Sequence, residues 1–326
     1  MKAIVHSQYG GPDVLQLVDV ETPRPADDEI LVKVHAAAMN PADWHLTRGT
    51  PYPIRFGSGL KQPKRARRLG LDYAGTVAAR GRTVARFEVG DAVFGGGEGS
   101  LAEYLTVKAD RGVARKPGNV TFDQAAGVAV AGVTALQALR NKAQVQQGQT
   151  VLINGAAGGV GTFAVQLAKA FGADVTGVQS TRNLELVRSI GADHVIDYTK
   201  DDFTSRGERY DVVLDNIGNH SVADTLRVVK PGGTYVPNVG GGPEDPASIG
   251  RMLWLLVMSP FISQRITFFL ATPNRDDLET LAGLMEAGKV TTAIDRCYPL
   301  SDAPAAMRHL ESRHARGKVI VTMPPA

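Results

Sequence analysis

The hydrophobic pattern divides the chain into two parts that are built differently. Up to residue 117, short runs of apolar or alternating residues, such as 2–5 and 29–36, are separated by clusters of Gly, Pro and Asp. This punctuation predicts short strands joined by turns. Many short strands of this kind indicate a small barrel or sandwich. The other runs cover residues 74–78, 92–94 and 102–107.

Beyond residue 117 the pattern alternates between strands and helices. Residues 122–139 have a helical pattern, and from residue 150 apolar runs alternate with amphipathic stretches. Such alternation predicts an α/β fold with a parallel sheet and helices on both faces. A helix over 301–310 and a strand over 318–323 break the alternation, and we expect this tail to pair with the first part. The other expected strands are 150–154, 174–178, 194–196, 210–215, 233–236 and 264–270, and the expected helices are 159–171, 182–190 and 275–286.

Composition narrows the class of protein. The 326 residues suit two domains, and 43% hydrophobic with 21% charged residues is ordinary for a globular protein with a sizeable core. A net charge of +3 gives no argument for a nucleic-acid partner. The start lacks the order of a secretory signal, and polar residues interrupt the apolar stretch 252–270, so we expect a cytoplasmic protein without a membrane span. The single cysteine, Cys297, excludes an internal disulfide and a four-thiolate structural zinc.

A glycine-rich loop, GAAGGVG, follows the strand at 150–154. Its small residues Ala156, Gly158 and Gly161 have the spacing of the dinucleotide-binding fingerprint, with alanine in the first place. Gly158 would let the backbone approach a pyrophosphate, and Gly161 would let the next helix lie close to the strand. The alternative is a strand-to-helix turn without a ligand. The backbone N–H groups at the start of the expected helix would bind phosphate. The predicted site therefore also includes Gly159 and Val160, the first residues of that helix.

The strand after this helix ends without a carboxylate. An NAD site usually places Asp or Glu about 20 residues beyond the glycines, on the ribose 2′-hydroxyl. Here the strand is followed by Ser180, Thr181 and Arg182. Hydroxyl groups and a guanidinium suit a phosphate, so these residues favour NADP. The alternative for Arg182 is a solvated residue in the first helical turn.

Several separate motifs then resemble one family over essentially the whole chain. In order they are NPAD at 40–43, LGLDYAG at 69–75, GDAVF at 90–94, AGVTA at 131–135, AAGGVG at 156–161, DNIG at 215–218, PGG at 231–233 and ARGK at 315–318. The chain resembles the zinc-independent quinone oxidoreductases of the medium-chain dehydrogenase/reductase superfamily. The bacterial NADP-dependent oxidoreductases similar to the mitochondrial reticulon-4-interacting protein look closest.

The resemblance implies a fold and an activity. The expected fold is a Rossmann doubly wound parallel sheet over 121–296, plus a GroES-like β-barrel domain over 1–120 that is rejoined by 297–326. NADPH is expected in the cleft between them, with hydride transfer to a quinone or, alternatively, to the C=C bond of an enone or 2-alkenal. Relatives commonly form homodimers. The stretch 252–270 is either a pocket wall or a subunit interface.

The resemblance also implies site residues. Residues at the positions of Asn40 and Tyr52 lie near the nicotinamide and the substrate in relatives. Tyr198 and the cation near Arg182 hold the 2′-phosphate. Thr134 is expected in the helix that lines the nicotinamide, although a helical threonine also bonds its own backbone. The remaining residues expected to line the cofactor are Asn216, Val239, Gly240, Ala315, Arg316, Gly317 and Lys318.

Zinc members of the superfamily bind the catalytic metal with a Cys, a Gly-His-Glu motif and a later Cys. Here Asn40 falls near the first position, and the second motif reads Gly70-Leu71-Asp72. A catalytic zinc needs three good protein ligands, so a zinc-free enzyme is expected. A quinone or enone delocalises the incoming charge itself, and donors that polarise its oxygen suffice.

Tyr52 is the first candidate donor, Asn40 the second, and Tyr73 a further phenol nearby. The alternatives are a surface aromatic for Tyr52 and an asparagine that satisfies loop backbone for Asn40. Because no definite proton donor emerges, a non-catalytic NADPH-binding sensor or partner-binding protein stays open. The cation-rich segment 61–68 lacks interleaved aromatic residues, and we interpret it as a solvated loop rather than a nucleic-acid site.

Overall fold

The computed structural model describes residues 1–52, 55–63, 67–238, 250, 254–255, 257 and 262–324. The chain forms two compact units. The first contains Met1–Val133 and Thr272–Ala326, and the second contains Thr134–Ala271. The first is therefore made of the two ends of the chain and the second of its middle.

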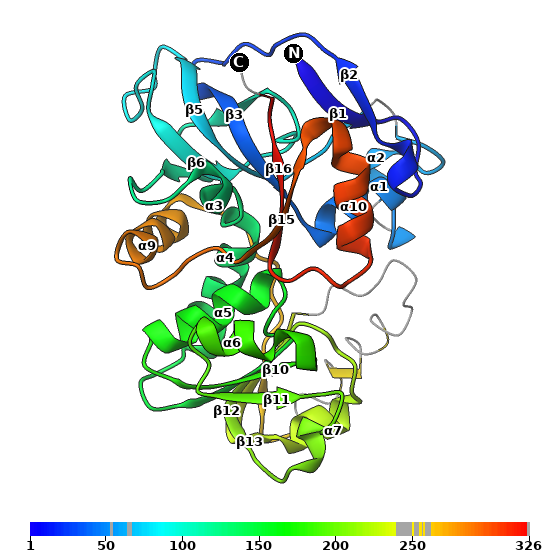
Figure 1. The fold of residues 1–326 in the computed structure, drawn as a ribbon, viewed down its shortest axis with the longest axis vertical. Helices are drawn as coiled ribbons and strands as arrows, with labels where there is room; N and C mark the ends of the chain where they lie inside the picture. The colour runs from blue at the N-terminus through cyan, green and yellow to red at the C-terminus, as the bar shows by residue number, and fades with distance from the viewer. Residues whose placement is uncertain are drawn as a thin grey trace. The chain divides into compact units, whose positions relative to one another are not determined.

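The first unit is a β-barrel-like arrangement of short strands, as the first part of the sequence predicts (Figure 1). Its main sheet has the order β15-β16-β3-β5-β6-β8, and β7 also pairs with β3. A smaller sheet has the order β2-β1-β4. The strands are β1 (Lys2–His6), β2 (Gln16–Asp19), β3 (Glu29–Met39), β4 (Arg67–Arg68), β5 (Asp72–Arg80), β6 (Ala92–Gly96), β7 (Tyr104–Lys108), β8 (Val113–Arg115), β15 (Ile294–Pro299) and β16 (Lys318–Thr322).

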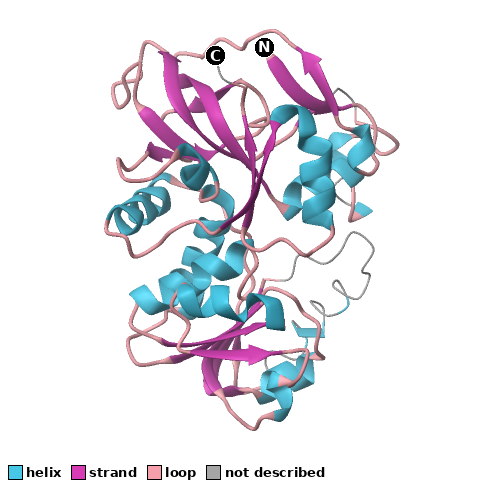
Figure 2. Cartoon of the chain, in the orientation of Figure 1, coloured by secondary structure: helices cyan, strands magenta, loops and turns pink. Residues whose placement is uncertain are grey.

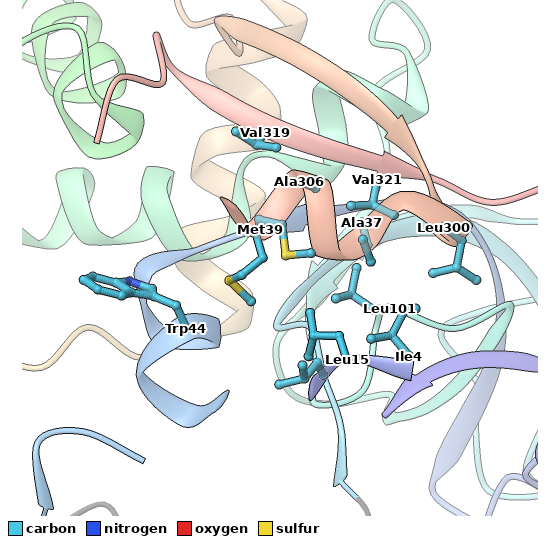
Figure 3. Packing of buried hydrophobic residues seen from close by; sticks show 13 residues of the cluster. Ile4, Leu15, Ala37, Met39, Trp44, Leu101, Leu300, Ala306, Val319 and Val321 are labelled. Carbon is cyan, nitrogen blue, oxygen red and sulfur yellow. The ribbon is translucent and has the colours of Figure 1, made fainter. Parts of the chain in front are cut away.

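The carboxyl-terminal segment of the chain returns to this unit. β16 pairs antiparallel with β3, and β15 pairs parallel with β16. Helix α10 (Ala303–Glu311) packs against both β15 and β16 (Figure 1). Met39 of β3, Ala306 of α10 and Val319 of β16 meet in one buried cluster, which the beginning of the chain completes with Ile4 and Leu15 (Figure 3).

Among the described residues, four further α-helices lie wholly in the first unit. Helix α1 (Pro41–Arg48) follows β3 directly, and α2 (Arg55–Ser58) is a single turn. Helix α3 (Phe122–Ala126) packs on β3, β5 and β6, and α9 (Arg275–Glu286) packs on β8. These contacts place residues 122–126 and 275–286 with the barrel, whereas the sequence assigned them to the middle domain.

The second unit is a parallel sheet with the order β11-β10-β9-β12-β13-β14. This is the doubly wound order, in which the chain starts in the middle, moves to one edge and then returns to build the other half. Because such crossovers are right-handed, α7 lies on the opposite face from α5 and α6. Figure 2 shows the strands side by side with helices against them. The strands are β9 (Thr150–Asn154), β10 (Asp174–Gln179), β11 (His194–Asp197), β12 (Tyr210–Asp215), β13 (Val229–Pro237) and β14 (Arg265–Ile266), and the helices are α5 (Gly159–Ala170), α6 (Leu184–Ser189) and α7 (Val222–Arg227).

The predicted helix over 122–139 is interrupted. α3 ends at Ala126, and α4 (Ala129–Leu136) continues as a π-helical segment, Gln137–Ala143. Gly127 lies at the break, and a Cβ there would lie 2.5 Å from the Thr292 side chain. The close packing of this segment against the carboxyl-terminal part thus requires a glycine. The predicted sixth strand over 264–270 is also shorter, since β14 has two residues.

Candidate functional site

The glycine loop lies between β9 and α5, where the fingerprint predicts it. Gly155 has a φ of +79°, a conformation that L side chains rarely adopt, and it makes the turn out of β9. Ala156, the first small residue of the fingerprint, follows Gly155 directly and is fully buried. A Cβ at Gly161 would lie 2.1 Å from the Gly155 carbonyl oxygen. Gly161 is therefore needed for the helix to pack against the turn.

Gly158 is different, because the protein leaves space beside it. It precedes α5 with extended backbone (φ −77°, ψ 173°), and a Cβ there would meet only the Gly155 oxygen, at 3.3 Å. Gly159 and Val160 form the first turn of α5, a helix of 12 residues. Backbone N–H groups at such a helix start bind phosphate, and the missing side chain at Gly158 gives a pyrophosphate room to approach. The loop thus fits a dinucleotide.

The carboxyl ends of β10 and β11 bring together the residues predicted to bind the 2′-phosphate. Ser180, Thr181 and Arg182 follow β10, and Tyr198 follows β11. The two ends are adjacent because the strands pair in parallel register. Arg182 is exposed, and the Tyr198 side chain is 51% exposed, so both can reach a ligand at this edge.

A carboxylate that the sequence analysis missed lies in this group. Asp197, the last residue of β11, accepts hydrogen bonds from Thr181 Oγ1 at 2.5 Å and from Thr199 Oγ1 at 2.7 Å. The Thr181 hydrogen bond is the main reason why the pKa of Asp197 lies below its usual value. Lys200 Nζ lies 3.7 Å from the same carboxylate. The Thr181 hydroxyl therefore faces an acid, whereas the sequence predicted that it would face a phosphate.

Asparagine side chains join the carboxyl ends of the central strands. Asn216, predicted to line the cofactor, donates from Nδ2 to the Asn154 carbonyl at 3.0 Å and accepts from Asn238 Nδ2 at 2.8 Å. Asn154 also donates to the buried carboxylate of Asp215 at 2.9 Å. These residues end β9, β12 and β13, at the edge of a doubly wound sheet where ligands bind.

In the first unit, Asn40 belongs to a buried polar cluster. It directly follows β3, begins α1 and is 2% exposed. Its Nδ2 donates to Asp72 Oδ2 at 3.0 Å and to the Ala38 carbonyl at 3.3 Å. Its Oδ1 accepts from Lys318 Nζ at 2.6 Å. Both amide hydrogens of Asn40 are therefore directed at acceptors inside the protein.

Lys318 and two aspartates complete this cluster. Lys318 is 3% exposed, and its ammonium group lies 3.3 Å from Asp72 Oδ2. Burial raises the pKa of Asp72, and the neighbouring Lys318 opposes that rise. Asp43 accepts from the backbone N–H groups of Asn40 at 2.8 Å and Gly70 at 3.1 Å. Burial raises the pKa of Asp43 to about 7, so this carboxyl group titrates near neutral pH.

The two candidate phenols have contrasting surroundings. Tyr52 is 58% exposed, and the Arg55 guanidinium lies 5.0 Å from its ring centre. Arg55 also donates to the Gly49 carbonyl at 2.8 Å, so it ties Tyr52 to the end of α1. Tyr73 is fully buried in the barrel, burial raises the pKa of its phenol, and its hydroxyl has no hydrogen-bond partner within the described part of the protein.

The other predicted residues are divided between the units. Thr134 is buried in α4. Ala315 packs against the core of the first unit, and Arg316 is exposed. Gly317 has a φ of +93° and turns the chain into β16. Val239 and Gly240 lie outside the described residues.

Comparisons with known proteins agree with this architecture. An alcohol dehydrogenase GroES-like domain model matches residues 26–118, and a zinc-binding dehydrogenase model matches residues 190–321. The chloroplastic NADPH-dependent alkenal/one oxidoreductase of Arabidopsis thaliana is 36% identical over 98% of this chain and 79% of its own length. The chloroplastic quinone-oxidoreductase homolog of Spinacia oleracea is 33% identical over 98% of both chains. This chain belongs to the quinone oxidoreductase-like family of the medium-chain dehydrogenase/reductase superfamily.

The family membership confirms the predicted fold, oxidoreductase class and cofactor. The solved structure of the Escherichia coli quinone oxidoreductase complexed with NADPH superposes with a TM-score of 0.83 at 27% identity, over 99% of this chain and 100% of that one. NADPH is the cofactor of this oxidoreductase. When bound, it supplies the hydride. The glycine loop and the ends of β10 and β11 are the residues that fit its phosphates.

Two further properties concern metals and membranes. In residues 1–52, 55–63, 67–238 and the other described ranges, no group of three or more His, Cys, Asp or Glu side chains is arranged to hold a metal ion. Every helix in the described part of the chain is too short or too polar to span a bilayer.

Proposed function

We propose that this oxidoreductase uses NADPH to reduce a quinone, by hydride transfer, without zinc. The observation that carries the proposal is the buried cluster at Asn40, Asp72 and Lys318, in the region where zinc members bind metal. An ammonium group already lies 3.3 Å from the only carboxylate of the second motif. A divalent cation there would be repelled by that ammonium group. Asn40 supplies an amide in place of a thiolate.

The chemistry of the acceptor follows from this arrangement. An alcohol substrate needs a Lewis acid to stabilise its alkoxide. A quinone spreads the incoming negative charge over its own carbonyl groups, so hydrogen-bond donors suffice. Tyr52 is the proposed donor, because its side chain is exposed whereas both amide hydrogens of Asn40 are engaged. Solvent can supply the last proton.

A second acceptor class is favoured by one specific observation. The Arabidopsis thaliana relative, which is 36% identical, is named an NADPH-dependent alkenal/one oxidoreductase. Reduction of the C=C bond of an enone or 2-alkenal also places charge on a conjugated carbonyl oxygen. It therefore requires the same donors and the same cofactor site as quinone reduction.

A substrate panel tests both proposals. NADPH consumption is measured with 1,4-benzoquinone, 9,10-phenanthrenequinone and a 2-alkenal, with NADH in parallel and with or without a chelator. We expect turnover with NADPH on the quinones and no effect of the chelator. Turnover on the alkenal alone supports the second class. NADPH binding without turnover on any acceptor would favour a sensor, and inhibition by the chelator would contradict zinc independence.

The remaining parts of the proposal concern location and assembly. We propose a cytoplasmic homodimer that binds no nucleic acid. The single cysteine, which is exposed, is compatible with a reducing compartment, and the small net charge of +3 gives little attraction to nucleic acid. Sedimentation of the protein alone, and with duplex DNA or RNA, tests assembly and nucleic-acid binding together.

A further inference from the structure

Lys318 is a cation that is almost entirely buried. It is 3% exposed, and its carboxylate partner Asp72 is 0% exposed. A buried ion pair loses so much hydration that apolar side chains of similar volume usually stabilise a fold as well or better. Stability alone therefore does not explain why this part of the barrel contains a lysine and an aspartate. Their geometry offers another explanation.

The ammonium group of Lys318 is fully engaged inside the protein. It lies 2.6 Å from Asn40 Oδ1, 3.3 Å from Asp72 Oδ2 and 3.4 Å from the Met39 carbonyl. An ammonium group has three hydrogens, so these contacts leave none for a ligand. Lys318 thus acts on Asn40 and Asp72, and it does not act on substrate or cofactor directly.

Asp72 joins three segments that are distant in the sequence. Its Oδ2 accepts from Asn40, at the corner between β3 and α1, and lies beside Lys318 at the start of β16. Its Oδ1 accepts from the backbone N–H of Val130 at 2.8 Å, in the first turn of α4. The carboxylate therefore fixes the Asn40 corner and the start of the helix that carries Thr134.

The ion pair also fixes the orientation of the Asn40 carboxamide. An ammonium group only donates and a carboxylate only accepts, so the oxygen of Asn40 must face Lys318 and its nitrogen must face Asp72. Removal of either charge would remove that constraint.

We propose that Asp72 and Lys318 are positioning residues of the reductase, which hold the Asn40 corner and the first turn of α4 in the arrangement that turnover requires. The proposal rests on the proposed function, because it assigns these two segments to the substrate end. It differs from the expectation that Lys318 contacts the cofactor. The lysine is an internal cation, and its effect reaches the reaction through Asn40 and α4.

The test is the double variant Asp72→Asn with Lys318→Met, which removes both charges and nearly preserves volume. We expect thermal stability close to that of the wild type, a Kd for NADPH within about threefold of it, and kcat reduced at least tenfold with the best acceptor of the panel. The matched control is Asp28→Asn with Lys108→Met, which removes an ion pair of the same unit that is more than half exposed. The control should match the wild type in all three measurements.

Amide hydrogen exchange provides a readout that needs no turnover. In the double variant, exchange should rise at Val130 and in residues 40–43 and stay unchanged in the rest of the barrel. Two results would each overturn the positioning role. One is a kcat of the double variant equal to that of the wild type. The other is unchanged hydrogen exchange at Val130 and residues 40–43 of the double variant while the wild-type protein turns over. A more than tenfold rise in the Kd for NADPH with kcat unchanged would also overturn it, since Lys318 would then contact the cofactor. If the wild-type protein shows no turnover with any acceptor, the proposed function is refuted. Hydrogen exchange in the double variant would still show whether Asp72 and Lys318 hold the Asn40 corner and the first turn of α4.

Discussion

Two glycines of the NADPH loop should differ in how the same substitution affects the stability of the fold. At Gly161 an added Cβ would lie 2.1 Å from the Gly155 oxygen and 2.8 Å from the Ala156 Cα, and real Cβ contacts are essentially never shorter than 3.0 Å. To relieve this contact the backbone of the turn would have to move by about 1 Å, and overpacking of this kind destabilises a fold. Gly161→Ala should therefore destabilise the second unit as well as weaken NADPH binding.

At Gly158 the fold itself tolerates a methyl group. The backbone is extended, and the new Cβ would meet one atom at 3.3 Å. A compatible Gly→Ala change stabilises by about 0.4–1 kcal/mol through the unfolded state, which offsets this mild contact. Gly161→Ala should cost about 1–3 kcal/mol, or about 2–4 °C in Tm for each kcal/mol. Gly158→Ala should leave Tm within a few degrees, on the same scale.

Both variants should bind NADPH more weakly, so thermal stability is the measurement that separates them. The methyl group of Gly158→Ala would occupy the space that the pyrophosphate needs, and we expect the Kd for NADPH to rise about tenfold or more, equivalent to about 1.4 kcal/mol. Thermal unfolding gives Tm, and quenching of protein fluorescence gives Kd. The control is Gly283→Ala on the exposed side of α9, where nothing lies within 4 Å. Gly158→Ala with wild-type affinity would refute the assignment of this loop to the pyrophosphate.

Three other predictions concern titration, cofactor choice and the buried phenol. The pKa of Asp43 is raised from 3.8 to about 7 in the native state. The protonated carboxyl group therefore contributes its full stabilisation, at most about 4 kcal/mol, below pH 3.8, and this contribution is lost progressively as the pH rises to 7. The stability difference between wild type and Asp43→Asn, from urea unfolding at several pH values, should fall over this window, and a constant difference would contradict the titration. Arg182→Gln and Tyr198→Phe should each raise the Kd for NADPH about tenfold and leave that for NADH unchanged; equal losses for both would exclude a role at the 2′-phosphate. Tyr73→Phe should retain activity and be neutral or up to about 1 kcal/mol more stable in unfolding assays, because it removes a buried hydroxyl without a partner; loss of turnover alone would identify this phenol as the proton donor.

Much of the fold could be predicted because local patterns coincide with tertiary burial. Strands β9 and β12 and helix α9 begin and end at the predicted residues. The central strands are buried on both faces and read as continuous apolar runs. β15 was missed because all of its side chains are at least partly exposed and give no alternation of buried and exposed positions. Helix α1 has few apolar positions, although asparagine before Pro41 and aspartate two residues after it are a recognisable helix start.

The candidate site could be predicted only where one segment builds it alone. The glycine loop belongs to a single strand–turn–helix unit, so the spacing of its small residues identified it. The positive φ of Gly155 is visible only in the folded structure. The acid at the phosphate end is the last residue of β11, and the expectation of an acid applied only to the end of β10. Strand pairing, which the sequence does not state, brings Asp197 to Thr181.

The buried cluster of Asn40, Asp72 and Lys318 could be predicted even less well, because its residues come from three segments that are distant in the sequence. Asn40 and Asp72 each lie in a motif that could be read locally, and neither motif refers to residue 318. Only the return of the chain as β16, antiparallel to β3, brings Lys318 Nζ to 2.6 Å from Asn40 Oδ1. A lysine at the start of an apolar strand would be expected to be solvated. Lys318 binds the Asn40 oxygen, and the Asn40 amide hydrogens are directed at Asp72 and the Ala38 carbonyl, so Asn40 is not a free amide donor. Under the proposed function we expect the proton for the reduced acceptor to come from an exposed group such as Tyr52 or from solvent. The substitution of Lys318 tests the positioning of Asn40, whereas substitution of Asn40 itself would also remove the amide.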